Sequence, residues 1–204
     1  LTFRSLNRTF APNMIKFSEL GLREELLKAM EEQGYEQPMP GQEQVIPWLV
    51  EQGENRDLIA LAQTGTGKTA AYGLPTLQIV SESEHAGSPM AKALVLAPTR
   101  ELCLQIADDL HGFSTHLPAM RILAVYGGAN IEPQLRALKH GVDIIVATPG
   151  RLIDLMKRGV ADLSEVSILV LDEADEMLSM GFQEELDEIL TGVPAEHRTL
   201  LFSA

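Results

Sequence analysis

A glycine-rich loop that ends in a lysine and a threonine follows the apolar run 58–61; it reads Ala62-Gln63-Thr64-Gly65-Thr66-Gly67-Lys68-Thr69. Consecutive backbone N–H groups that open a helix form a concave donor array with a partial positive charge, which suits phosphates. Gly65 and Gly67 let the backbone approach phosphate oxygens. Lys68 can reach the outer phosphates, and the Thr69 hydroxyl can ligate Mg²⁺. The loop therefore predicts a nucleoside-triphosphate site, although Ala62 stands at the first glycine position of the general G-x-x-x-x-G-K-[ST] pattern.

A second cluster, Asp172-Glu173-Ala174-Asp175, follows the apolar run 168–171. Asp172 is placed to hold Mg²⁺ through its water shell, because Mg²⁺ gives up water reluctantly. Glu173 can take a proton from an attacking water. The alternative is an acidic helix start, where carboxylates favour the positive end of the dipole. Beside the phosphate loop, the cluster predicts a triphosphate hydrolase with Lys68, Asp172 and Glu173 as its catalytic groups.

Six continuous apolar runs predict the strands that position these clusters; they span 58–61, 93–97, 122–125, 144–147, 168–171 and 200–202. Unbroken runs suit strands that are covered on both faces. Helical patterns lie between them, at 69–80, 101–111, 131–139, 151–157 and 183–190. Such alternation predicts an α/β fold, a mostly parallel sheet with helices on both faces. An amphipathic stripe in 18–34 (Leu20, Leu22, Leu26, Leu27 and Met30) predicts a helix packed on the core.

Each apolar run is followed by residues that could contact a ligand. The groups are 62–69, 98–101, 126–128, 148–151, 172–175 and 203–204, in the order of the runs. In an open parallel sheet, ligands bind beyond the carboxyl ends of the strands. We therefore expect all of these groups on one rim of the sheet.

These motifs resemble, in order, those of the DEAD-box RNA helicases of helicase superfamily 2. The similarity runs from Phe17 to Ala204 and covers the family's first RecA-like, P-loop NTPase domain. It pairs 62–69 with motif I, 98–102 with motif Ia, 127–128 with the glycine doublet, 148–151 with motif Ib, 172–175 with the motif that names the family, and 203–204 with the start of motif III. The resemblance implies binding of ATP or ADP with Mg²⁺, and an enzyme that couples ATP hydrolysis to RNA binding and local duplex unwinding.

Residues 17–42 resemble the segment that reads adenine in this family, the Q motif. The Gln42 amide could accept from the adenine N6 amino group and donate to N7. Phe17, at the spacing of the family's isolated aromatic, could stack on the base. The segment departs from the family at Met39, where threonine is usual, and at Gly41, where isoleucine is usual. The alternative is a helix and turn with a surface glutamine.

The resemblance also implies an RNA surface made of Pro98, Thr99, Arg100, Gly127, Gly128, Thr148, Pro149, Gly150 and Arg151. Arg100 and Arg151 can pair with phosphates, and the glycines allow a close backbone approach. Because none of these groups reads base edges, binding should be largely sequence-independent, with 2′-hydroxyl contacts favouring RNA. Each arginine taken alone could instead be a structural or solvated charge. A hydrogen bond between Asp175 and Ser203 would couple hydrolysis to this surface.

The net charge of −13 is unlike that of a nucleic-acid binder. It is unevenly spread, since nine acidic residues and only Arg198 lie from residue 172 onward. Average charge governs solubility rather than a local groove, so we expect RNA binding by this chain alone, but weak. The single cysteine, Cys103, excludes an intrachain disulfide and favours a reducing compartment. Without a long apolar span or a signal peptide, we expect a cytoplasmic protein with no membrane partner.

The family's enzymes close two RecA-like domains over ATP and RNA, and the second domain, with its arginine fingers, is absent from these residues. We expect 14–204 to be the first RecA-like domain of a longer protein, with 1–13 a non-native or disordered leader. Alone, this monomeric fragment should bind nucleotide, hydrolyse it hardly at all and not unwind RNA. Two alternatives stay open for the whole protein: an ATP-controlled RNA clamp or assembly scaffold, and a superfamily 2 ATPase that acts on DNA.

Overall fold

A computed structural model describes residues 15–51, 57–61, 65–83, 88–117 and 120–203. Within them, six strands form one sheet in the order β1-β6-β5-β2-β4-β3, and every neighbouring pair is parallel. The strands are β1 (Leu58–Leu61), β2 (Ala93–Leu96), β3 (Ile122–Val125), β4 (Ile144–Ala147), β5 (Ile168–Leu171) and β6 (Arg198–Ser203). All six predicted strands are present, within two residues at each end. The expected leader 1–13 lies outside the described residues.

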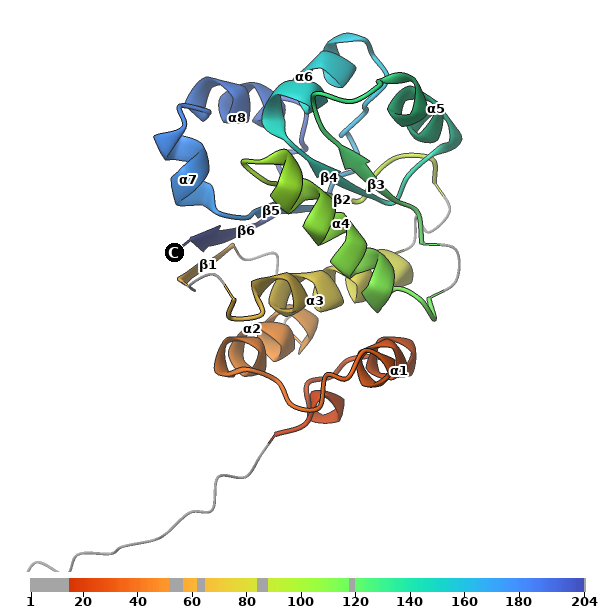
Figure 1. Ribbon diagram of the computed structural model, residues 1–204, viewed down its shortest axis with the longest axis vertical. Helices are drawn as coiled ribbons and strands as arrows, with labels where there is room; N and C mark the ends of the chain where they lie inside the picture. Colours follow the sequence, from red (N-terminus) through yellow and green to blue (C-terminus); the bar gives the residue numbers. More distant parts are fainter. Residues whose placement is uncertain (1–14, 52–56, 62–64, 84–87, 118–119, 204) are drawn as a thin grey trace, which may run out of the picture.

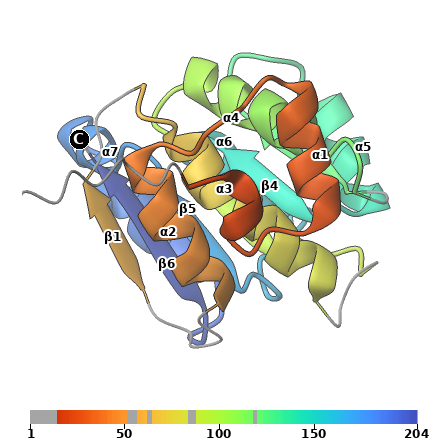
Figure 2. The same ribbon diagram turned by 90° about the horizontal axis from the view of Figure 1, so that it is seen from below.

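Helices cover both faces of the sheet (Figure 1). The first face carries a 3₁₀ turn, η1 (Phe17–Glu19), and the helices α1 (Glu24–Glu32), α2 (Pro40–Glu51), α3 (Lys68–Glu82) and α4 (Arg100–Phe113). The second face carries α5 (Glu132–His140), α6 (Pro149–Lys157), α7 (Ala174–Ser179) and α8 (Gln183–Leu190). Figure 2, seen from below, shows α1, α2 and α3 lying across the first face. The predicted α/β fold with helices on both faces is confirmed.

Two hydrophobic cores share the same central strands. In β2, Ala93 and Val95 point into the core under α1–α4, whereas Leu94 and Leu96 point into the core under α5–α8. Successive side chains of a strand alternate between the two faces, so an unbroken apolar run serves both cores at once. The strands β2 and β4 are buried along their whole length.

The strand β1 does not share this double cover. Ile59 and Leu61 are 71% and 79% exposed, and β1 forms one edge of the sheet. No helix among the described residues covers that outer face, while Leu58 and Ala60 pack against the first core. The expectation that all six apolar runs are covered on both faces is therefore wrong for β1, because an apolar run alone does not say where a strand stands in the sheet.

The amphipathic stripe in 18–34 is not one helix. Gly21 has φ +78°, which ends the short turn η1, and α1 begins only at Glu24. The predicted core residues are nonetheless packed on the first core: Leu20, Leu22, Leu26 and Met30 are buried, and Leu27 is partly buried. The sequence patterns also did not predict a helix at α2, whose first two residues are proline and glycine.

Helix α3 is the central helix of the first face. It packs between α2 and α4, and most of its residues are buried. A Cβ on Gly73 would lie 2.7 Å from Leu110 Cδ2, so the glycine allows α3 to approach α4 closely. Because α3 begins at Lys68, the end of the phosphate loop is attached to a firmly packed helix.

Ion pairs hold the opposite rim, where the strands begin. Lys92, which is 3% exposed, pairs with Glu165 ahead of β2 and β5. Arg121 binds Asp143 through two guanidinium nitrogens, at 2.7 and 3.1 Å, ahead of β3 and β4. Side chains thus join the amino ends of β2 and β5 and of β3 and β4, at the rim opposite the groups predicted to contact ligands. No helix in the described parts of the chain is long and apolar enough to cross a membrane.

The open face of β1 leads to a stability prediction. Replacing Leu200, which is 1% exposed, by alanine should lower the free energy of unfolding by about 2–5 kcal/mol. Replacing Ile59 by alanine should cost less than about 1 kcal/mol, because most of the deleted surface already faces water. Urea unfolding of the two variants measures both values. Equal losses would mean that β1 is covered in solution.

Candidate nucleotide and RNA sites

The structure brings Lys68 and Asp172 together from separate elements. Lys68 Nζ lies 3.5 Å from Asp172 Oδ1, and the two side chains are 8% and 2% exposed. Lys68 opens α3, whereas Asp172 directly follows β5; the strands β1 and β5 flank β6. The ammonium makes no hydrogen bond to any described residue, although it is buried. A buried cation without an acceptor fits a triphosphate, whose oxygens would supply those acceptors.

Glu173 lies beside this pair with unusual backbone torsions. Its φ is +51°, the only positive value at a non-glycine residue in the described part of the chain. Its Oε1 is 4.0 Å from Lys68 Nζ, and its N–H donates to Asp172 Oδ1 at 2.9 Å. Burial raises the pKa of the Glu173 carboxyl, a hydrogen bond with Glu176 raises it further, and Lys68 opposes both. A carboxylate with a raised pKa next to a phosphate site suits a general base.

The described part of the phosphate loop needs its glycines. Gly65 and Gly67 have φ of +81° and +71°, in the left-handed region that glycine adopts without strain. Both glycines line a cleft of about 290 Å³ together with Lys68, Thr69, Asp172 and Glu173. Ala62, Gln63 and Thr64 lie outside the described residues. The Thr69 and Asp172 oxygens in one cleft are the hard donors that Mg²⁺ prefers.

The Gln42 side chain is hydrogen-bonded to the phosphate loop and to the segment that precedes α2. It is 2% exposed; its Nε2 donates to the Gly67 carbonyl at 3.1 Å, and its Oε1 accepts from the Met39 N–H at 2.8 Å. The alternative of a surface glutamine is therefore wrong. Adenine recognition by Gln42 stays a prediction, and it would use the second N–H and the second lone pair of this amide.

Phe17 lies beneath the surface rather than in an open cleft. It is 5% exposed, and its ring meets Tyr35 edge-on with the centroids 6.5 Å apart. Tyr35, which is 41% exposed, lines the phosphate cleft. Stacking of adenine on Phe17 stays a prediction, and it would require part of this ring to be uncovered.

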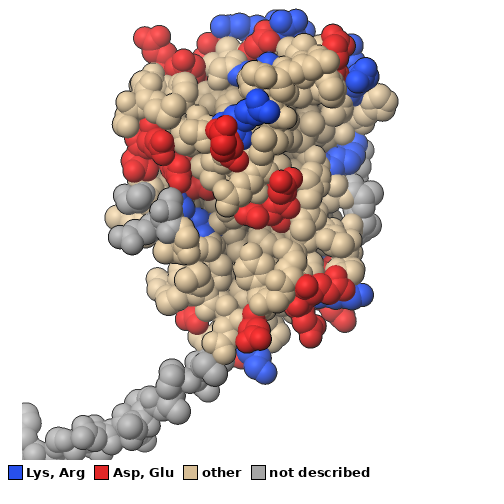
Figure 3. All heavy atoms as spheres, viewed as in Figure 1, with Lys and Arg blue, Asp and Glu red and all other residues tan. Residues whose placement is uncertain are grey.

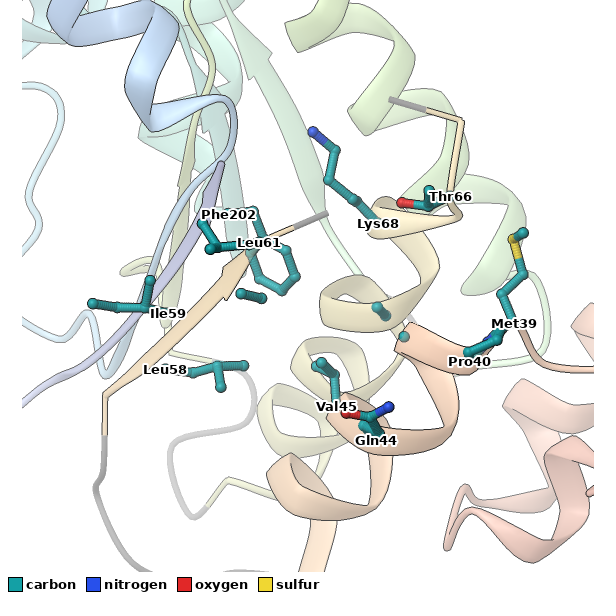
Figure 4. Close-up of a pocket in the computed structure, with 13 residues that line it drawn as sticks. Met39, Pro40, Gln44, Val45, Leu58, Ile59, Leu61, Thr66, Lys68 and Phe202 are labelled. Atoms are coloured by element: carbon teal, nitrogen blue, oxygen red, sulfur yellow. The ribbon is translucent and has the colours of Figure 1, made fainter. Parts of the chain in front are cut away.

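A second hollow, of about 560 Å³, lies between α2, α3 and β1. Its walls are mainly apolar, and Met39, Pro40, Val45, Leu58 and Phe202 are among the residues that line it (Figure 4). Lys68 reaches its edge, but its side chain rises away from Met39 and Pro40. None of the described residues that line this hollow is acidic.

The predicted RNA residues also converge at the carboxyl end of the sheet. Seven of the nine line one shallow groove: Pro98, Arg100, Gly127, Thr148, Pro149, Gly150 and Arg151. Gly128 adjoins it, since a Cβ there would lie 3.7 Å from Arg100 Nη1. Thr99 instead caps α4, accepting from the Leu102 N–H at 3.2 Å. The expectation of a shared rim is thus met by the geometry, whereas RNA binding itself stays a prediction.

The two arginines of the groove are held by neutral partners. The Arg100 guanidinium lies over the Tyr126 ring, 4.9 Å from its centroid. Arg151 donates to Gln134 Oε1 at 3.3 Å and to the Ala129 carbonyl at 3.1 Å. These contacts orient each charge without neutralising it, so both arginines can still pair with a phosphate.

The sheet and its two sites match a known family. The model of the DEAD/DEAH box helicases matches residues 39–204. The chain belongs to this family. It is 49% identical over 188 residues to the ATP-dependent RNA helicase DeaD of Escherichia coli, which covers 92% of this chain and 29% of DeaD. It is also 49% identical over 191 residues to the DEAD-box ATP-dependent RNA helicase CshA of Geobacillus kaustophilus. This match covers 94% of this chain and 39% of CshA.

A solved structure supports the same assignment. The chain resembles a DEAD box protein from Methanococcus jannaschii, with a TM-score of 0.83 and 39% identity over 93% of this chain and 50% of that one. The RecA-like fold expected from the motifs is thereby confirmed. The chain spans only 29–39% of DeaD and CshA.

The DEAD-box acids and their neighbours carry much of the negative charge. Figure 3 shows acidic side chains gathered over the part of the surface that α7 and α8 form. Asp175, Glu176, Glu184 and Asp187 are exposed there. Asp175 is the second residue of α7, which packs against β6, the strand that ends in Ser203. The hydrogen bond between Asp175 and Ser203 stays a prediction.

Sequence reasoning missed several residues around both DEAD-box sites. Tyr72 and Asp109 reach the phosphate site from α3 and α4, and Phe182 and Asp154 line the groove. Burial raises the pKa of the Asp109 carboxyl, and a hydrogen bond with Thr69 opposes that shift. The position of Tyr72, four residues after Lys68, was a usable signal, because residues four apart share a helix face. For Asp109, Phe182 and Asp154, only the tertiary fold shows the proximity.

The loop glycines allow a matched test of the close contact between Gln42 and Gly67. A Cβ on Gly67 would lie 2.3 Å from Gln42 Nε2, whereas a Cβ on Gly65 would have no atom of the described residues within 4 Å. Both positions have positive φ, so either alanine should cost about 1 kcal/mol in backbone strain. Gly67→Ala should cost about 1–3 kcal/mol more, because Gln42 must move. Urea unfolding compares the two variants; equal losses would contradict this contact.

Proposed function

We propose that this chain is the ATP-binding domain of an RNA-dependent ATPase, and that the whole protein couples ATP hydrolysis to local unwinding of RNA duplexes. The observation that carries the proposal is the buried Lys68 ammonium, unbonded to any described acceptor and held beside Asp172 and Glu173. Membership of the DEAD/DEAH box family supports ATP-dependent helicase chemistry. We assign residues 14–204 to the first RecA-like domain, including the Q-motif region 17–42.

Hydrolysis would use the groups of the phosphate cleft in distinct roles. Lys68 and the loop N–H groups hold the phosphate oxygens and offset the charge that develops on them. Glu173 orients the attacking water and accepts its proton. Thr69 and Asp172 would hold Mg²⁺, which when bound supplies positive charge at the phosphoryl oxygens. The rigid start of α3 keeps Lys68 in place without reorganisation during the reaction.

Base selection would be linked to the phosphate loop through Gln42. Its amide already holds the Gly67 carbonyl, so an adenine contact to the same amide would act directly on the loop. Phe17, beneath Tyr35, would support the base by stacking. The threonine hydroxyl and the isoleucine side chain that are usual at positions 39 and 41 are absent here, so adenine selectivity rests on Gln42 and the aromatic pair.

RNA would bind in the groove of Arg100 and Arg151 through its sugar–phosphate backbone. The groove offers guanidinium groups and glycine backbone rather than side chains that read base edges. Asp154 also lines it, and the acidic surface over α7 and α8 adds repulsion, so this chain alone should bind RNA weakly. A second RecA-like domain in the longer protein would supply the opposite wall and the arginine fingers.

Two substitutions in the whole protein test the catalytic roles. Glu173→Gln should leave ATP binding intact and lower kcat by about 10²–10⁴-fold, because the amide cannot accept the proton from water. Lys68→Ala should weaken ATP binding itself, because the phosphates lose their buried cation. Calorimetry measures binding, and phosphate release measures turnover. Normal turnover by Glu173→Gln would contradict its role as base.

The same whole protein distinguishes the remaining alternatives. Strand displacement that requires ATP supports unwinding, whereas ATP-dependent RNA retention without displacement would identify a clamp or assembly scaffold. DNA that stimulates hydrolysis as strongly as RNA would identify an ATPase acting on DNA.

For the 204-residue chain alone, we expect ADP to bind at least as tightly as ATP. Among the described residues that line the cleft, Lys68 is the single lysine or arginine, so a γ-phosphate gains little extra charge stabilisation. We also expect negligible RNA-stimulated hydrolysis, and weaker binding of both nucleotides once EDTA removes Mg²⁺. Titration calorimetry with and without EDTA checks these expectations. ATP binding more than about tenfold tighter than ADP, or 1.4 kcal/mol, would contradict the first.

A further inference from the structure

Tyr72 connects the phosphate-loop helix to the acid at the end of β5. Its hydroxyl donates a hydrogen bond of 2.8 Å to Asp172 Oδ2. The side chain is fully buried, and its ring packs on Phe202 with centroids 5.0 Å apart and a 56° tilt. The ring alone would satisfy the packing, so the hydroxyl is a separate feature.

Three groups fix the Asp172 carboxylate. Oδ2 accepts from the Tyr72 hydroxyl, while Oδ1 accepts from the Glu173 N–H at 2.9 Å and faces Lys68 Nζ at 3.5 Å. Lys68 and Tyr72 lie four residues apart and therefore share one face of α3. Helix α3 thus contacts both oxygens of the carboxylate, which sets the rotation of its plane.

The Tyr72 hydroxyl is a permanent donor. A phenol keeps its proton at neutral pH, so the hydroxyl can donate to Asp172 Oδ2 continuously. Tyr72 therefore contacts Asp172 and follows Thr69 by three residues on α3, so its helix carries one of the two residues that would hold Mg²⁺ and its hydroxyl holds the other.

We propose that Tyr72 is a positioning residue for Mg²⁺-dependent nucleotide binding: its hydroxyl holds the Asp172 carboxylate in the orientation that receives the ion. The proposal rests on the proposed function. Hydrogen-bond partners of metal ligands act in this way, since they fix the orientation of the ligand and their loss typically costs 10–100-fold in metal affinity. Here the partner comes from the helix that carries the phosphate loop, so the loop and Asp172 are positioned by one rigid element.

The test is Tyr72→Phe in the 204-residue chain and in the whole protein. The affinity for ADP is measured by calorimetry at saturating Mg²⁺, across a Mg²⁺ titration, and in EDTA. We expect the Mg²⁺ concentration for half-maximal stimulation of ADP binding to rise about tenfold or more. ADP affinity in EDTA should stay within about twofold of the original, because Lys68 and the loop are untouched. An unchanged Mg²⁺ requirement would overturn the proposal.

Phe202→Leu is the matched control, because it removes the ring contact of Tyr72 and leaves the hydroxyl on Asp172. It should lower Tm while leaving the Mg²⁺ requirement for ADP binding unchanged. A change in that requirement as large as that of Tyr72→Phe would assign the effect to packing. Should Tyr72→Phe be too unstable at 25 °C, the Mg²⁺ titration is made at 10 °C, with Tm recorded for every variant.

A double substitution shows whether Tyr72 acts through Asp172. In an Asp172→Asn background, adding Tyr72→Phe should change the Mg²⁺ requirement by less than about twofold, since the oriented carboxylate is already gone. A full additional effect would contradict the proposed route. A chain that binds no ADP under any condition would refute the proposed function. Mg²⁺-dependent ADP binding whose Mg²⁺ requirement is unchanged by Tyr72→Phe would refute this inference and leave the proposed function standing.

Discussion

The buried ammonium of Lys68 is the interaction around which the rest of this structure is arranged. A cation removed from water is costly unless anions and acceptors surround it. Asp172 and Glu173 lie 3.5 and 4.0 Å from it, yet no described residue accepts a hydrogen bond from it. The protein therefore holds a buried ammonium whose hydrogen bonds are unmade, and phosphate oxygens could accept them. Preorganised charge of this kind requires no rearrangement when the ligand arrives.

Such a site depends on rigid placement of two distant chain segments. Lys68 belongs to α3, which is buried between α2 and α4, and Asp172 belongs to the end of β5, which is buried between two cores. Ion pairs of Lys92 and Arg121 join the strands at the other rim. Ion pairs thus join strands at the amino end of the sheet, whereas the Lys68 ammonium at the carboxyl end has no described hydrogen-bond acceptor. Ligands bind at the carboxyl end in an open parallel sheet.

The sequence predicted the strands well, and the described groups that follow the strands lie at one edge of the sheet, because both depend on local patterns. Apolar runs mark buried strands wherever they stand, and the groups after them must share an edge. The open face of β1, by contrast, depends on which strand lies at the border of the sheet. Gln42 is buried against Gly67, and Phe17 is packed against Tyr35. Both contacts join residues that are separated in sequence, so local patterns do not reveal them. The break at Gly21 was missed because the apolar spacing of 18–34 continues across it, although its backbone does not.

The backbone of Glu173 has a consequence for how this protein can change. A side chain at φ +51° costs about 1–2 kcal/mol relative to a glycine there, and asparagine also tolerates that region better than glutamate. Local folding preference therefore opposes the residue to which the proposed hydrolysis assigns the role of base. A laboratory screen that rewarded heat resistance alone would tend to replace Glu173, and would thereby select against that proposed role.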